Sequence, residues 1–327
     1  LEMTVNPDSI IALQPDYCNS CGLSLEKATS VLASSRQVVD IPPIKAFWTE
    51  YRTYSKHCAC GCRTTADFPK GVDSTVSYGS NIEGLIGYFH ARQYLPFARM
   101  KEMLNVIFNI DISEGGIHYL LNRFADKTTP FYDLIGQRVS NSPVVGTDET
   151  GAKVNGNKHW FWTWQTPKLT YITHCDTRGK AAIDSHFPKG FPNSTLVHDG
   201  WRPQTGTLAK HHQTCLPHLL RHLNYLNEKY SNTTWAQHFK TLLYDDIMLI
   251  KEYETQKKKP RRTKIIQRLE RLLEDPPDKE NKELYTFYKR MLRERQHLFT
   301  FLFIENVPHD NNASERAIRN IKVKQKI

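Results

Sequence analysis

The sequence predicts an α/β protein built from three successive segments. Five of its cysteines fall within the first 62 residues, and apolar residues then recur at helical spacing up to about residue 138. From residue 143 the pattern changes to alternating and β-branched residues, which are typical of strands, before helical spacing returns after residue 216. The chain has 327 residues, 39% of them hydrophobic, so it is long enough to bury sizeable cores without disulfides.

The charge balance favours an anionic partner. Lys and Arg number 44 against 34 Asp and Glu, which gives a net charge of +10, and nucleic acid is the first partner class that this excess suggests. No apolar run is long enough for a transmembrane helix, and the opening residues lack the basic and apolar parts of a signal peptide. We therefore expect a cytoplasmic protein with no membrane partner. The start at Leu1 and the end within Lys322–Ile327 suggest a fragment with a truncated C-terminus.

The cysteines of the first segment predict a structural Zn²⁺ site. Cys18 and Cys21 form a C-x-x-C-G turn, which presents two thiolates to one tetrahedral ion, and Cys58, Cys60 and Cys62 supply the other pair. Four of these five residues would bind the ion, and the spacing leaves open which four. The alternative is a set of free surface thiols. Residues 1–70 are thus interpreted as a zinc-ribbon module, with a strand expected over residues 36–41.

Residues 71–142 predict a helical domain. Helical spacing marks segments over residues 81–93, from Pro96, and from Ser113, with a short break at residues 109–113. A helix, a short break and a second helix is the arrangement of a helix-turn-helix, which would make this domain DNA-binding. A plain three-helix packing unit fits the same pattern.

Residues 143–327 predict a third domain with a mixed sheet. Strands are expected at residues 144–147, 159–165, 169–175, 196–200 and 211–215, with a helix at 180–187 between the third and the fourth. Three antiparallel strands followed by helix, strand, connection and strand is the order of a ribonuclease-H-like fold. Helical spacing then covers residues 216–229, 234–253, 264–274 and 280–303.

A basic segment lies between two of these helices. It contains Lys257, Lys258, Lys259, Arg261 and Arg262. The segment is interpreted either as a solvated loop or as a contact to the phosphate backbone of DNA, which would carry no sequence specificity.

Three carboxylates are candidates for a divalent metal site. Asp148 and Asp199 each follow an apolar run, and the first and fourth strands are neighbours in a ribonuclease-H-like sheet, so the two side chains should converge. Glu315 would complete the site from a helix. Mg²⁺, or Mn²⁺, suits all-oxygen ligands and serves in phosphoryl transfer. The alternatives are that strand-end Asp residues stabilise turns and that Glu315 caps a helix together with Asn312.

Several segments resemble the insertion-sequence-66 family of bacterial DDE transposases. The Cys18–Gly22 turn with the later cysteines resembles the zinc-binding module of that family, and segments between Phe68 and Gly115 resemble its helical linker. Four later blocks carry the rest of the match: Thr147-Asp-Glu-Thr-Gly151, Val197-His-Asp-Gly-Trp201, Cys215-Leu-Pro-His218-Leu-Leu-Arg221 and Asp310-Asn-Asn-Ala-Ser-Glu-Arg-Ala-Ile-Arg319.

The resemblance implies a function and its residues. Asp148, Asp199 and Glu315 would be the catalytic DDE triad, and about residues 216–307 would be a large helical insertion in the ribonuclease-H-like core. The implied enzyme is a Mg²⁺-dependent DNA transposase, in which water attacks a phosphodiester at the transposon end and the freed 3′-hydroxyl then attacks target DNA. Its implied partners are transposon-end and target DNA, further copies of itself on DNA, and accessory transposition proteins, with a location at the nucleoid of the bacterial cytoplasm.

Some alternatives remain beside this interpretation. The chain could be a ribonuclease-H-like nuclease that cuts without joining, or a non-catalytic zinc-containing DNA-binding protein derived from a transposase. Arg221 and Arg319 could contact phosphates or pair with the carboxylates. Cys215 and His218 could be metal ligands, although a buried thiol and a hydrogen-bonded histidine are preferred.

Overall fold

The computed structural model describes residues 2–42, 44–72, 74–256 and 262–326. The chain separates into two compact units, residues 1–75 with 101–113, and residues 76–100 with 114–327. The α/β class is confirmed by a five-stranded mixed sheet accompanied by many helices. In the described part of the chain, no helix is both long and apolar enough to cross a bilayer.

The first unit has little regular structure. Its hairpin joins β1 (Ser55–His57) to antiparallel β2 (Arg63–Thr65). The strand expected over residues 36–41 is wrong, because these residues adopt no regular structure. Val38 and Val39 are 93% and 84% exposed. A β-branched run becomes a strand through cross-strand pairing and burial, and here it has neither.

The three predicted helices of the second segment are confirmed. They are α1 (Ser80–Ala91), α2 (Phe97–Phe108) and α3 (Glu114–Ser140). The buried carboxylate of Glu83 on α1 pairs with Lys127 at 2.7 Å and with Arg123 at 3.1 Å, both on α3. Arg123 therefore has an internal partner. The helix-turn-helix interpretation stays a prediction.

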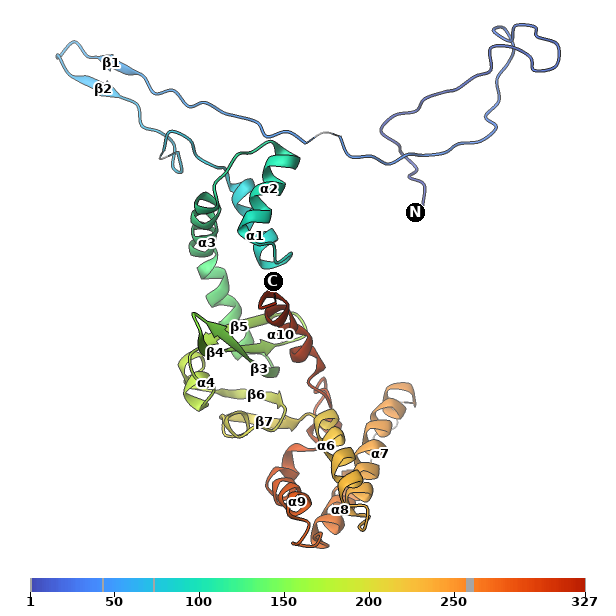
Figure 1. Cartoon of the computed structure of the whole chain (residues 1–327), viewed down its shortest axis with the longest axis vertical. Helices are drawn as coiled ribbons and strands as arrows, with labels where there is room; N and C mark the ends of the chain where they lie inside the picture. The colour runs from blue at the N-terminus through green and yellow to red at the C-terminus, as the bar shows by residue number, and fades with distance from the viewer. Residues whose placement is uncertain (1, 43, 73, 257–261, 327) are drawn as a thin grey trace. The chain divides into compact units, whose positions relative to one another are not determined.

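The sheet has the strand order β5-β4-β3-β6-β7, which can be followed in Figure 1. β4 runs antiparallel to both β3 and β5, whereas β6 lies parallel to β3 and to β7. The strands are β3 (Val144–Val154), β4 (Asn157–Gln165), β5 (Thr170–Cys175), β6 (Phe191–His198) and β7 (Ala209–Thr214), with α4 (Lys180–His186) and the short α5 (Arg202–Thr205) between them. All five strands were predicted, although β3 and β6 are longer than expected.

Two cores form around this sheet. One contains Trp162 and Trp164 of β4, the end of α3 at Val139, and α4 at Ile183. The other joins Val144 of β3 and Val197 of β6 to the helices that follow the sheet. The sheet therefore has apolar packing on both faces, and this packing holds the inner strands β3 and β6 in place.

Helices α6 to α9 gather beyond the β7 edge of the sheet (Figure 1). They are α6 (Leu216–Lys229), α7 (Trp235–Gln256), α8 (Arg262–Glu274) and α9 (Lys282–Glu294), and α10 (Asn312–Lys324) then returns to the sheet. The backbone N–H of Leu216 donates to the carbonyl of His309 at 2.9 Å. The two ends of the helical segment between these residues therefore lie next to each other at the sheet.

The helix expected over residues 280–303 is wrong in its second half. It ends at Glu294, and two 3₁₀ turns follow, η1 (Arg295–His297) and η2 (Thr300–Leu302). The cause is β7, where the Gln213 side chain donates to the carbonyl of Leu298 and accepts from the N–H of Phe301. These bonds occupy backbone groups that an α-helix would need.

Asp246 on α7 predicts a pH-dependent stability. Its side chain is fully buried, both of its oxygens lack a hydrogen-bond partner, and burial raises its pKa to about 7. A carboxyl group whose pKa is higher in the folded than in the unfolded protein contributes fully to the free energy of unfolding at pH values below its unfolded pKa, which is near 4. This contribution is lost as the pH rises through the folded pKa of about 7. Asp246→Asn should therefore leave the free energy of unfolding nearly unchanged at pH 4 and raise it by about 1–3 kcal/mol at pH 8 relative to the parent.

Urea denaturation at both pH values measures this difference. Asp245→Asn is the matched control, because Asp245 is exposed and pairs with Arg268 at 2.6 Å. That variant should lose no more than about 1 kcal/mol. Equal pH profiles for Asp246→Asn and the parent would show that Asp246 titrates normally.

Candidate active site

The strand register places Asp148 and Asp199 side by side. Gly146 of β3 pairs with Val197 of the parallel neighbour β6, and each aspartate lies two residues further along its strand direction. One detail differs from the prediction: Asp148 lies in the middle of β3 rather than at its end, because pairing with β4 continues to Val154. Asp199 directly follows β6, which ends at His198.

Helix α10 brings Glu315 to the same place. Gly146 permits this approach, since a Cβ there would clash with Ser314 Oγ and lie 3.1 Å from Asn311 Oδ1. Asn311 then fixes the helix, because its buried side-chain amide donates to the Thr147 carbonyl at 2.7 Å and to Asp199 Oδ1 at 3.3 Å.

The capping alternative for Glu315 is not observed. The N-cap of α10 is Asn311 rather than Asn312, and no side chain makes a capping hydrogen bond there. Glu315 lies in the first turn of the helix, and its Oε1 is buried without a hydrogen-bond partner. It is therefore available to a ligand.

Cys215 and His218 adjoin the carboxylates. His218 Nδ1 lies 3.2 Å from Asp199 Oδ1, 3.7 Å from Glu315 Oε1 and 3.2 Å from Cys215 Sγ. Among the described residues, this is the group in which at least three potential metal-ligand side chains come together, within 4.8 Å of one another. Arg221 Nη2 lies 3.8 Å from Glu315 Oε1.

The carboxylates of the site are partly buried and act on one another electrostatically. Burial, together with the charges of Asp199, Glu149 and Glu315, raises the pKa of Asp148 to about 7. Burial also raises the pKa of Asp199, with Glu315 adding to the shift and His218 and Asn311 opposing it. Carboxylates that resist ionisation because they are buried and lie close to other carboxylates are stabilised by a cation. The residues therefore fit a divalent metal ion.

Glu149 is engaged elsewhere. It faces away from Asp148 on the other side of β3, where its carboxylate accepts from Arg178 at 2.7 Å and from Gln204 at 2.9 Å. The Arg178 guanidinium lies over the rings of Trp160 and Trp201, with centroids at 4.8 and 4.0 Å. These contacts separate Glu149 from the three candidate catalytic carboxylates.

The loop that carries Asp199 is fixed by α9. Arg290 Nη2 donates to the Asp199 carbonyl at 2.9 Å, and the N–H of Gly200 donates to His198 Nδ1 at 2.9 Å. Gly200 has a φ of +79°, a conformation that a residue with a Cβ rarely adopts. Sequence reasoning missed Arg290 and Asn311, because each lies about a hundred residues from its partner and no spacing pattern marks it.

The structure describes the side chain of only one of the six predicted DNA-contacting residues, Arg319. Lys257, Lys258, Lys259 and Arg261 lie outside the described residues, and Arg262 begins α8 without a described side chain. Arg319 is exposed on α10, one turn after Glu315. It therefore lies on the helix that carries a candidate catalytic residue.

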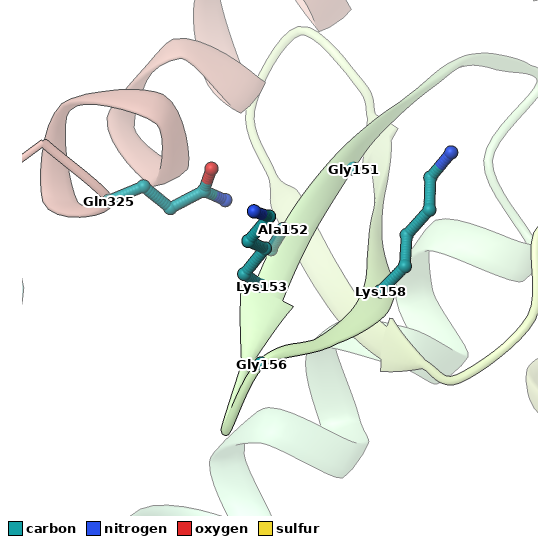
Figure 2. A pocket seen from close by; sticks show the side chains of 6 residues that line it. All are labelled: Gly151, Ala152, Lys153, Gly156, Lys158 and Gln325. Atoms are coloured by element: carbon teal, nitrogen blue, oxygen red, sulfur yellow. The ribbon is translucent and has the colours of Figure 1, made fainter.

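A hollow of about 430 Å³ lies beside the β3–β4 hairpin, away from the carboxylates. Figure 2 shows Gln325, just after α10, facing Lys153 and Ala152 across it. The remaining lining residues are Gly151, Gly156 and Lys158. Two exposed lysines and no acid give this hollow a positive lining, which suits a phosphate group.

The N-terminal cysteines occupy two tight turns. The N–H of Gly22 donates to the Cys18 carbonyl, and that of Gly61 to the Cys58 carbonyl, both at 2.9 Å, with a positive φ at each glycine. Amides of Cys21 and Ser20 lower the pKa of Cys18, and the Cys62 amide with the neighbouring thiols lowers that of Cys60. Zinc binding stays a prediction, because the five cysteines do not form a metal-ligand group in the described chain.

The family model described as "Transposase IS66 family" matches residues 76–327, which include all three candidate catalytic carboxylates and the strands and helices that position them. No curated protein matches the chain.

Proposed function

The chain belongs to the IS66 family of transposases, and we propose that it cuts DNA at transposon ends and joins the freed ends to target DNA in a divalent-metal-dependent reaction. The observation that carries this proposal is the convergence of Asp148, Asp199 and Glu315 from two parallel strands and one helix. Their mutual repulsion is the property expected of a site built for cations.

We also propose a ribonuclease-H-like core for residues 143–327. Support comes from the strand order β5-β4-β3-β6-β7 with β4 antiparallel to both neighbours, and from α10 packed on β3 and β4. The helices between Leu216 and His309 are then the insertion, at about residues 216–307. The proposed preceding domains are a zinc-binding module at 1–70 and a helical DNA-binding domain at 71–142.

Each carboxylate has a role in the proposal. Asp148, Asp199 and Glu315 would hold Mg²⁺ or Mn²⁺, and the bound ions would supply Lewis-acid chemistry for phosphoryl transfer. Asn311 orients Asp199 and holds α10 against β3, so that Glu315 stays beside the two aspartates. Arg290 fixes the backbone of Asp199 from α9. No covalent protein–DNA intermediate is required.

DNA is the proposed partner at several surfaces. Arg319, the basic segment with Lys257, Lys258, Lys259, Arg261 and Arg262, and the lysines of the β3–β4 hairpin would contact phosphates. We further propose that several copies assemble on paired ends, with accessory transposition proteins, in the bacterial cytoplasm. The lowered thiol pKa values at Cys18 and Cys60 support a structural Zn²⁺ held by four of the five N-terminal cysteines.

The proposal is tested with labelled duplexes taken from the DNA that flanks the gene of this protein, together with a supercoiled target plasmid. We expect nicking at the duplex end and insertion into the plasmid with 5 mM Mg²⁺. Neither product should form with EDTA, because the carboxylates alone supply no Lewis acid. Cutting without insertion would favour a nuclease. Metal-independent binding without cutting would favour a non-catalytic DNA-binding protein.

A further inference from the structure

Four side chains at the ends of three elements, β6, α6 and α10, bring one potential ligand atom each close together. Asp199 follows β6, Cys215 precedes α6, His218 lies in the first turn of α6, and Glu315 lies in the first turn of α10. One ligand atom of each residue lies within 4.8 Å of those of the others. Asp148 is not a member of this group.

The spacing fits a small tetrahedral ion. Zinc bonds of about 2.3 Å to sulfur and about 2.0–2.2 Å to nitrogen and oxygen place neighbouring ligand atoms about 3.3–3.7 Å apart. His218 Nδ1 lies 3.2 Å from Asp199 Oδ1, 3.2 Å from Cys215 Sγ and 3.7 Å from Glu315 Oε1. These three contacts lie within a few tenths of an ångström of the tetrahedral spacing, and all four ligand atoms lie within 4.8 Å of one another.

The elements are held together without an ion. The N–H of Asn311 donates to Cys215 Sγ at 3.3 Å, and the amide of Asn311 donates to Asp199. Leu216 and His309 join the starts of α6 and α10 through a backbone hydrogen bond of 2.9 Å. Glu315 Oε1 has no hydrogen-bond partner although it is buried. The geometry is therefore preorganised, and one ligand remains unsatisfied.

The ligand chemistry differs from that of a magnesium site. Mg²⁺ takes oxygen ligands in an octahedral shell, whereas a thiolate and an imidazole favour Zn²⁺ or Co²⁺ in a tetrahedral one. A buried thiol binds such an ion as the thiolate, because the charge of the ion drives its deprotonation.

We propose that Asp199, Cys215, His218 and Glu315 form a transition-metal site for Zn²⁺ or Co²⁺. The site shares two carboxylates with the proposed magnesium site, so an ion bound in it withdraws both from Mg²⁺. Its existence does not depend on the proposed transposase activity.

The test is a Co²⁺ titration of the full chain under a phosphine reductant, followed by absorption spectroscopy. Thiolate ligation produces near-ultraviolet charge-transfer absorption, and tetrahedral geometry produces strong visible bands. Because the N-terminal cysteines can also bind Co²⁺, the readout is the difference between variants.

Cys215→Ser and His218→Gln should each bind one equivalent fewer and lose the corresponding part of the spectrum. Cys175→Ser is the matched control, because Cys175 lies outside the group and contacts His186 at 3.4 Å.

His218→Gln keeps the test valid if Cys215→Ser misfolds, since the His218 side chain is about one third exposed. Unchanged stoichiometry and spectra in both folded variants would overturn the proposal. Asp148→Asn separates this proposal from the proposed function, because it should retain the full spectrum while DNA cleavage is lost. A spectrum that decreases with Asp148→Asn as it does with His218→Gln would also overturn the assigned ligand set.

Discussion

Cleavage of transposon-end DNA should fall by at least about 10³-fold when Asp148 is replaced by Asn or Glu315 by Gln. Each substitution keeps the shape of the side chain and removes one negative charge from the proposed cation site. The expected loss is large because the ion that these residues are proposed to hold would stabilise the charge that develops on the phosphate oxygens. The measurement is the rate of end cleavage in Mg²⁺ at pH 8, under single-turnover conditions.

Folding controls accompany this measurement. Because burial and the neighbouring carboxylates raise the pKa of Asp148 to about 7, Asp148→Asn should not destabilise the metal-free protein at pH 8, and urea denaturation of the variant checks this. Asp184→Asn is the matched control, since that exposed residue pairs with Lys180 at 2.7 Å, and its rate should equal the parental rate. Parental cleavage rates in both Asp148→Asn and Glu315→Gln would reject the proposed triad.

Trp164→Ala should lower the free energy of unfolding by about 3–5 kcal/mol. Trp164 is fully buried on β4, stacks on Trp162 with ring centroids 5.8 Å apart, and contacts Phe187 edge-on at 4.8 Å. Removing its ring leaves a cavity that the close-packed face of the sheet cannot fill. Because Trp164 pairs with Thr147, the residue before Asp148, the cavity would lie next to the strand that carries Asp148.

The measurement is chemical denaturation followed by circular dichroism. Trp48→Ala is the matched control, because Trp48 is 80% exposed, and its replacement should change stability by no more than about 0.5 kcal/mol. Similar losses for the two variants would show that the aromatic cluster does not support the sheet.

Sequence patterns predicted the strands and most helices because the apolar residues of these elements recur on the face that is buried. The alternating aromatics of residues 159–165 became β4, and the apolar stripe after Leu216 became α6. The patterns failed where contacts with distant residues determine whether an element forms or where it ends. Val38 and Val39 have no neighbouring strand, and the helix expected to reach Phe303 ends at Glu294 because the Gln213 side chain binds the backbone beyond it.

The candidate site shows the same division. Strand order indicated that Asp148 and Asp199 would be neighbours, and the register places them at equivalent positions. The supporting contacts could not be predicted, because Asn311 and Arg290 act across intervals of 112 and 91 residues. The distance from the Cys215 sulfur to the carboxylates depends on where α6 begins. Sequence spacing does not fix the position of a helix start to within an ångström.

The hydrogen bond between Leu216 and His309 has a consequence for the length of the chain. A segment whose two ends meet can grow, shrink or be exchanged without altering the distance between the parts that it connects, and lengthening a closed loop costs little entropy. Insertions or deletions within helices α6 to α9 should therefore change the number of residues between Asp199 and Glu315 without changing the separation of the two side chains in space.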